Sequence, residues 1–128
     1  MEEKDIRYVG SLVRDRIPEI LRREGNFPMT RTLDDEEYLY QLHESLKHAI
    51  EVYMSQRSVA DLSDVLEIID AIAEMRGVTD EEIVKIRNYR AMTFGTYHNR
   101  LFLEKMLTPE EKKTLDKEEE EAGFDVQF

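Results

Sequence analysis

The sequence has 128 residues and a mass of 15.2 kDa, which suits a single domain that buries a sizeable hydrophobic core. Its 29 acidic and 18 basic side chains give a formal net charge of −11, which argues against nucleic acid or an anionic membrane as the main partner, since proteins that bind these present basic surfaces. The chain has no cysteine, no apolar run as long as a membrane span and no signal-peptide pattern, so a soluble, cytoplasmic protein without disulfides or thiolate chemistry is expected.

Long stretches of the chain follow helical spacing, and only five glycines and three prolines interrupt the sequence. Residues 11–24 predict a short helix or a pair of helices, and residues 25–33 predict a loop. A second helix is expected to start at Asp34, with Glu37 as its capping partner. The polar residues 55–57 mark its end.

A third helix is predicted from Val59 to Met75, with Ser58 as its N-cap and Gly77 as its stop signal. A fourth helix, opened by the Thr-x-x-Glu capping box at Thr79, continues to roughly Arg90. The chain has too few turn-forming residues for a many-stranded sheet, so the predicted fold class is an all-α helical bundle.

The C-terminal part of the chain is strongly acidic. We expect an all-α domain over residues 1–107 and an acidic helix or tail over residues 108–128, which starts with a cap at Thr108 and a proline in the first turn. Residues 108–128 contain eight acidic and three basic side chains, a net charge of −5, which is typical of a solvated tail. The alternative is a docking arm that places three apolar side chains on a neighbouring subunit: Phe124, Val126 and Phe128.

Two aspartates interrupt the apolar face of the third helix. Asp61 and Asp64 fall inside the arc of leucine, isoleucine and valine side chains, about one turn apart. Carboxylates on a core-facing surface are costly unless they are paired or bind a metal, and oxygen ligands suit Mg²⁺ or Mn²⁺. A capping interaction with Ser58 would explain Asp61 without a metal, but it does not explain Asp64.

Four segments spread over residues 12–104 resemble, in the same order, the MazG-like family of all-α nucleoside triphosphate pyrophosphohydrolases. The resemblance is to the phosphoribosyl-ATP pyrophosphohydrolase-like branch of that family. The matching segments are Leu12–Leu21 (LVRDRIPEIL), Thr32–Tyr38 (TLDDEEY), Asp61–Ile69 (DLSDVLEII), and Gly95 with Asn99–Leu103 (NRLFL).

The resemblance implies a helical bundle that assembles as a homodimer or homotetramer and catalyses Mg²⁺-dependent hydrolysis of a nucleotide to a monophosphate and pyrophosphate. Two helices of the family supply the metal ligands. The Glu-x-x-Asp motif of one helix falls on Asp61 and Asp64, with aspartate in place of glutamate. The Glu-Glu-x-x-Glu motif of the other falls on His48, Ala49 and Val52, so all three carboxylates are lost. His48 is either a nitrogen ligand or an ordinary surface histidine.

Phosphate contacts would then depend on arginine side chains. The family's Arg-Gly-Gly-Phe segment is replaced by residues 94–97 (FGTY), which removes one basic group. The candidates for binding the substrate's phosphates, each of which could instead form only surface ion pairs, are Arg14, Arg87, Arg90 and Arg100.

The sequence therefore leaves three hypotheses open and identifies no catalytic residue. The first is a nucleotide pyrophosphohydrolase with an altered Mg²⁺ or Mn²⁺ site, which residues of a partner subunit complete. The second is a binding or structural protein that has kept the fold and either holds a nucleotide-like ligand without cleaving it or acts only through its assembly. The third is an interaction module whose acidic tail docks another protein. No nucleic acid or membrane partner is expected in any of them.

Overall fold

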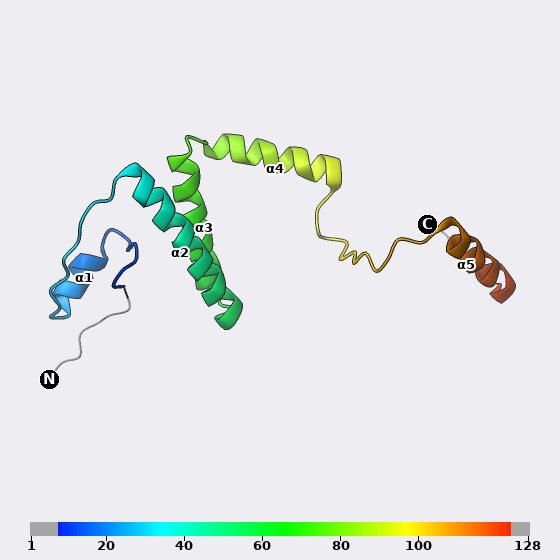
Figure 1. Cartoon of the computed structure of the whole chain (residues 1–128), viewed down its shortest axis with the longest axis horizontal. Coiled ribbons are helices and arrows are strands. Elements are labelled where there is room, and N and C mark those ends of the chain that lie inside the picture. The colour runs from blue at the N-terminus through cyan, green and yellow to red at the C-terminus, as the bar shows by residue number, and fades with distance from the viewer. Residues whose placement is uncertain (1–7, 124–128) are drawn as a thin grey trace. The chain divides into compact units, whose positions relative to one another are not determined.

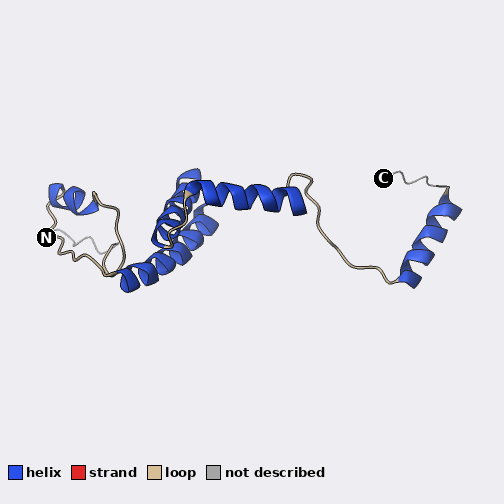
Figure 2. Cartoon of the chain, turned by 90° about the horizontal axis from the view of Figure 1, so that it is seen from above, coloured by secondary structure: helices blue, strands red, loops and turns tan. Residues whose placement is uncertain are grey.

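The computed structural model describes residues 8–123, and within this range it contains five helices and no strand (Figures 1 and 2). The all-α prediction is confirmed for this part of the chain. None of the helices in this range combines the length and apolar character needed to cross a membrane. The chain divides after Asn88 into two compact units. The docking arm considered for residues 124–128 lies outside the described range. The helices are α1 (Ile17–Arg23), α2 (Asp35–Gln56), α3 (Val59–Met75), α4 (Asp80–Phe94) and α5 (Pro109–Ala122).

Helix α1 is shorter than the predicted helical stretch of residues 11–24, because residues 11–16 form a turn and an extended segment. Pro18 lies in the first turn of α1. Proline has no N–H and disfavours helical geometry in the residue before it, so it fits the start of a helix better than its interior.

Helices α2 and α3 lie side by side and form an antiparallel hairpin (Figure 1). Only Arg57 and Ser58 connect them. Arg57 adopts a left-handed conformation with φ of 59°, and its N–H donates to the carbonyl oxygen of Tyr53 at 2.7 Å. The Ser58 hydroxyl accepts a hydrogen bond from the Asp61 N–H at 3.0 Å, which confirms Ser58 as the N-cap of α3.

Gly77 ends α3 as predicted. Its φ of 70° lies in the left-handed region, where glycine is favoured because it has no Cβ. The Gly77 N–H donates to the Glu74 oxygen at 3.0 Å, and the Val78 N–H donates to the Ala73 oxygen at 2.9 Å. This pair of bonds is the Schellman arrangement, which satisfies carbonyl groups that the helix end would leave unpaired.

Helix α4 opens with the expected capping box, because Thr79 and Glu82 each bond the other's backbone N–H through their side chains. It ends at Phe94, four residues beyond the predicted end at Arg90. The chain has no proline or glycine between these positions, so nothing stops the helix before Gly95, whose φ is 85°.

Helix α5 follows its predicted pattern closely. Thr108 and Glu111 form a reciprocal capping box, Pro109 lies in the first turn, and Gly123 caps the end with φ of 73°.

The expected sizeable core is absent from the described residues, where the only buried hydrophobic side chains are Leu21 and Leu42. Exposed apolar side chains on α3 account for much of the missing core. Val65, Ile72 and Ala73 are half-buried, whereas Leu62, Leu66 and Ile69 on the same arc are 43%, 59% and 40% exposed. The predicted apolar arc is therefore present, but the described residues cover only part of it.

Candidate functional site

An ion pair joins two of the residues that the sequence singles out. The Arg14 Nη2 atom donates to the Asp64 Oδ1 atom at 2.7 Å. Arg14 lies in the extended segment before α1, and Asp64 lies in the second turn of α3. Both side chains are more than half exposed, so the pair contributes at most about 1 kcal/mol to stability. Its interest is chemical, since it brings a candidate phosphate-binding group to a candidate metal ligand.

Asp61 lies three residues before Asp64 on α3, but its carboxylate has another partner. The Ser58 hydroxyl donates to the Asp61 Oδ2 atom at 2.6 Å and accepts from the Asp61 N–H at 3.0 Å. Asp61 therefore takes part in the helix cap, as the alternative interpretation expected.

The two aspartates offer at most part of the ligand set that a divalent metal ion needs. Mg²⁺ prefers six oxygen ligands in octahedral geometry, of which proteins usually supply one or two carboxylates besides water and phosphate. Within residues 8–123, no group of three or more histidine, aspartate or glutamate side chains could hold a metal ion together. Ala49 and Val52 are half-buried on α2 and offer no ligand. The described residues of one chain thus bring together no more than two candidate carboxylates for such an ion.

The remaining candidate residues are all exposed. His48 projects from α2, and Arg87 and Arg90 lie one turn apart on α4. The Arg90 guanidinium lies 5.6 Å from the centre of the Phe94 ring, a cation–π contact that holds it on its own helix. Arg100 has a left-handed backbone with φ of 59° in the loop after α4. The only pair of candidates in direct contact in the described chain is Arg14 with Asp64.

A second ion pair, which the sequence analysis missed, fixes the loop before α2. The Arg31 guanidinium donates two parallel hydrogen bonds to the Glu37 carboxylate, at 2.8 and 2.6 Å. These bonds and the positive charge of Arg31 lower the pKa of Glu37, and the same hydrogen bonding raises the pKa of Arg31. Asp34 accepts from the Glu37 N–H as expected, but the Glu37 carboxylate binds Arg31 instead of completing the predicted capping box.

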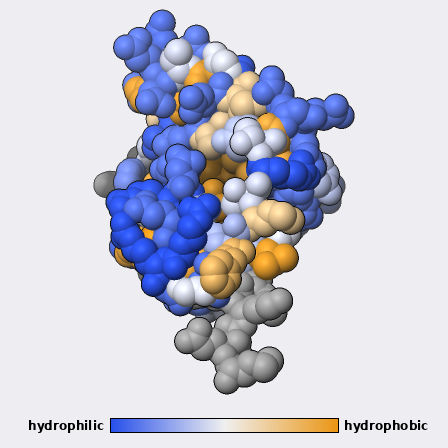
Figure 3. Space-filling view, turned by 90° about the vertical axis from the view of Figure 1, so that its left-hand side faces the viewer, coloured by the Kyte–Doolittle hydropathy of each residue, from blue (hydrophilic) through white to orange (hydrophobic). Residues whose placement is uncertain are grey.

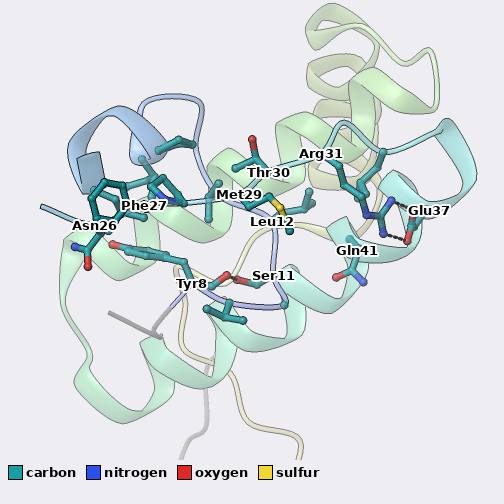
Figure 4. A pocket seen from close by; sticks show the side chains of 18 of the residues that line it. Tyr8, Ser11, Leu12, Asn26, Phe27, Met29, Thr30, Arg31, Glu37 and Gln41 are labelled. Carbon is teal, nitrogen blue, oxygen red and sulfur yellow. Dashed lines mark hydrogen bonds and ion pairs between the residues drawn. The ribbon is translucent and has the colours of Figure 1, made fainter. Parts of the chain in front are cut away.

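Beside this pair lies a cavity of about 1010 Å³, lined only by residues between 8 and 41 (Figure 4). Its walls come from the segment before α1, from α1 itself, from the loop of residues 25–33 and from the first turns of α2. The space-filling view of Figure 3 shows a hollow edged by hydrophobic side chains, and hydrophilic side chains lie outside this edge. One signal in the sequence pointed here: Phe27 and Met29 are large apolar side chains in a predicted loop, and they are 97% and 99% exposed.

Comparison with known proteins gives little information on identity. No model of a known protein family matches the chain, and no solved structure matches it. A protein of Mycolicibacterium smegmatis (strain ATCC 700084 / mc(2)155), described only as uncharacterized, is 45% identical over 42 residues. This match covers 33% of the present chain and 43% of the other protein, so the chain spans less than half the length of that relative.

Proposed function

We propose that this protein binds a nucleotide by its phosphate chain and hydrolyses it to a monophosphate and pyrophosphate with the help of Mg²⁺ or Mn²⁺. The observation that carries the proposal is the cluster of Arg14, Asp61 and Asp64, in which a guanidinium lies against one of two carboxylates one helical turn apart. The four segments that resemble MazG-like pyrophosphohydrolases support the same activity.

Each group in this cluster has a role in the proposal. Arginine presents five N–H donors in a planar fork suited to phosphate oxygens, and Asp64 bonds the Nη2 atom and so orients the guanidinium. Asp61 and Asp64 would hold the divalent metal ion, with His48 as a further candidate ligand. When bound, that ion would stabilise developing negative charge and help orient a water molecule. Arg87, Arg90 and Arg100 are further candidates for phosphate contacts.

A homodimer or homotetramer is part of the proposal, and we expect its contact surface to include α3. Leu62, Leu66 and Ile69 leave more apolar surface exposed than an isolated helix pair normally tolerates in water. Light scattering should give the mass of a dimer or tetramer for the natural chain and that of a smaller species for Leu66→Glu. The control Ser63→Glu adds the same charge on the polar face of α3 and should not change the mass.

Circular dichroism of Leu66→Glu should show that its helices persist. A natural chain that is monomeric at micromolar concentration would contradict the proposed assembly. If Leu66→Glu and Ser63→Glu lowered the mass from light scattering equally, the subunit contact would not be specific to the apolar face of α3.

A nucleotide-binding protein without hydrolysis is the second candidate, and one observation favours it. Ala49 and Val52 provide no ligand where the resembling family has glutamates, and Arg14 already neutralises Asp64. Such a protein would hold the phosphate chain through Arg14 and leave it intact. The cytoplasm remains the proposed location in both cases, because the chain has no cysteine.

Pyrophosphate release distinguishes the two candidates. Purified protein is incubated with a panel of standard and modified nucleoside triphosphates, with Mg²⁺, with Mn²⁺ or with a chelator. We expect release from at least one nucleotide with a divalent ion and none with the chelator. If no nucleotide is cleaved but one of them raises the melting temperature, the binding protein is the better description.

A further inference from the structure

We infer that the cavity lined by residues 8–41 binds a nucleobase, and that a nucleotide at this site places its phosphate chain at Arg14. The inference extends the proposed function, since it requires the ligand to be a nucleotide. Four features carry it: the cavity's position next to Arg14, two carboxamide side chains, two aromatic rings, and an ion pair that cancels local charge.

The cavity and the Arg14–Asp64 pair are adjacent along the backbone. Leu12 and Val13 line the cavity, and Arg14 is the next residue. Consecutive Cα atoms lie about 3.8 Å apart, so the backbone of Arg14 adjoins the cavity wall, while its guanidinium bonds Asp64 outside the lining. A base in the cavity thus leaves the sugar and the phosphates to extend towards Arg14.

Two carboxamides present donors and acceptors to the cavity. Both Asn26 and Gln41 line it, at opposite ends: Asn26 lies towards Tyr8 and Gln41 towards Glu37 (Figure 4). Within residues 8–123 neither side chain makes a hydrogen bond to the protein. A carboxamide offers two N–H donors and one carbonyl acceptor, which is the pattern that matches the edge of a base. Both side chains are half-buried, which limits their exposure to competing water.

The backbone holds Asn26 in place through the end of α1. Gly25 has φ of 90°, its N–H donates to the Arg22 oxygen at 3.1 Å, and the Asn26 N–H donates to the Leu21 oxygen at 2.9 Å. This is a second Schellman arrangement, and its left-handed residue favours glycine. Asn26 therefore leaves the helix in a fixed direction, and Leu21 beneath it is buried.

Aromatic rings lie at the same end of the cavity as Asn26. Figure 4 shows Tyr8 and Phe27 there, and both belong to the lining. The Phe27 side chain is 97% exposed, so a face of its ring is open to a flat partner. Bases stack on aromatic side chains, and each such contact contributes about 1–3 kcal/mol to binding.

The other end of the cavity is polar but carries no net charge. Arg31 and Glu37 both line it, and their two parallel hydrogen bonds pair the guanidinium with the carboxylate. Because each Arg31–Glu37 partner satisfies the charge of the other, the pair attracts a phosphate group only weakly and suits an uncharged heterocycle. Arg14 is also ion-paired, but it gives Asp64 a single hydrogen bond from Nη2 and keeps its other N–H donors, which assigns the phosphates to Arg14 and the base to the cavity.

Two-dimensional ¹H–¹⁵N NMR of the full chain tests the inference with adenosine, guanosine, cytidine and uridine, which carry no phosphate. We expect at least one nucleoside to shift the side-chain amide signal of Asn26, which lies at the aromatic end, and the Gln41 signal reports on the other end of the cavity. The same residue types elsewhere in the chain serve as matched controls and should not move: Gln56, Asn88 and Asn99. No shift with any nucleoside, or equal shifts in the controls, would overturn the inference.

An experiment with inorganic triphosphate distinguishes failure of the base site from failure of the proposed phosphate site at Arg14. It should shift the Arg14 Nε–H signal and leave Asn26 and Gln41 in place. If triphosphate moves Arg14 but no nucleoside moves the amides, the phosphate site stands and the base site fails. If nucleosides move the amides while triphosphate leaves Arg14 unchanged, the base site stands and the proposed phosphate chemistry at Arg14 fails.

A substitution gives a second test. Phe27→Ala should weaken the binding of the nucleoside identified by NMR by at least about fivefold, because it removes the stacking surface. Phe94→Ala removes an aromatic ring that is also exposed but lies outside the cavity lining, and should leave the affinity unchanged. Since Phe27 is almost fully exposed, its loss should not unfold the protein, and an unaltered affinity would contradict the stacking role.

Discussion

Replacement of Asp64 by asparagine should lower pyrophosphate release by roughly 100-fold or more. The substitution keeps the size and shape of the side chain but removes the negative charge that orients Arg14 and, in the proposed function, helps to hold the metal ion. Because a transition state gains from every group that orients the phosphate chain, losing both effects at once should reduce kcat more than it raises KM. The measurement is the steady-state rate with the best nucleotide of the panel at saturating Mg²⁺.

The matched control is Asp70→Asn, which changes the same kind of side chain on the same helix. Asp70 is exposed, and its position falls on the opposite, polar face of α3. The Asp70→Asn substitution changes the net charge by the same amount as Asp64→Asn, so a general electrostatic effect would appear in both variants. Equal losses in the two variants, or full activity of Asp64→Asn, would rule out a specific role for Asp64.

Truncation of Leu42 to alanine should lower the free energy of unfolding by about 2–5 kcal/mol. Leu42 is only 5% exposed and is one of two buried hydrophobic side chains in the described chain. Its removal leaves a void that its neighbours fill only in part. A domain of this size is stable by about 5–15 kcal/mol, so the loss is a large share of the total. Urea unfolding followed by circular dichroism at one fixed protein concentration measures it.

Tyr40→Ala is the comparison for this experiment. Tyr40 lies two residues away on α2 and is 60% exposed, so its truncation should change the stability by no more than about 0.5 kcal/mol. A loss below about 1 kcal/mol for Leu42→Ala would show that Leu42 has no role in a packed core. The difference between the two variants is therefore more informative than either value alone.

Local chemistry made most of the helix boundaries predictable. Ser58, Thr79 and Thr108 cap the three helices that they were expected to cap, and Gly77 ends α3 through two backbone hydrogen bonds. Such signals act within about five residues, so the local sequence contains them in full. The end of α4 was misplaced because nothing near Arg90 stops a helix.

Contacts between distant residues were not predictable in this way. Asp61 and Asp64 stood out because they interrupt an apolar arc, which is a property of one helix. The bond from Arg14 to Asp64 spans 50 residues and depends on how the chain folds back. The cavity was missed for the same reason, since it is formed by a loop, a short helix and the start of α2 together.

The amount of buried surface was overestimated because periodicity reports which side of a helix is apolar and not what covers it. Leu66 belongs to the expected arc on α3, yet it is 59% exposed. A partner for such a surface leaves no mark in the periodicity of a single chain.

The two-residue connection between α2 and α3 has a consequence for the order of folding. Arg57 and Ser58 bring the two helices together with a very small loss of chain entropy, because the loop that closes is short. Contacts between neighbours in sequence form faster than those that wait for remote segments. We therefore expect the α2–α3 hairpin to form early in folding, before Arg14 reaches Asp64. During synthesis, the hairpin can assemble once residue 75 has left the ribosome, before the chain is complete.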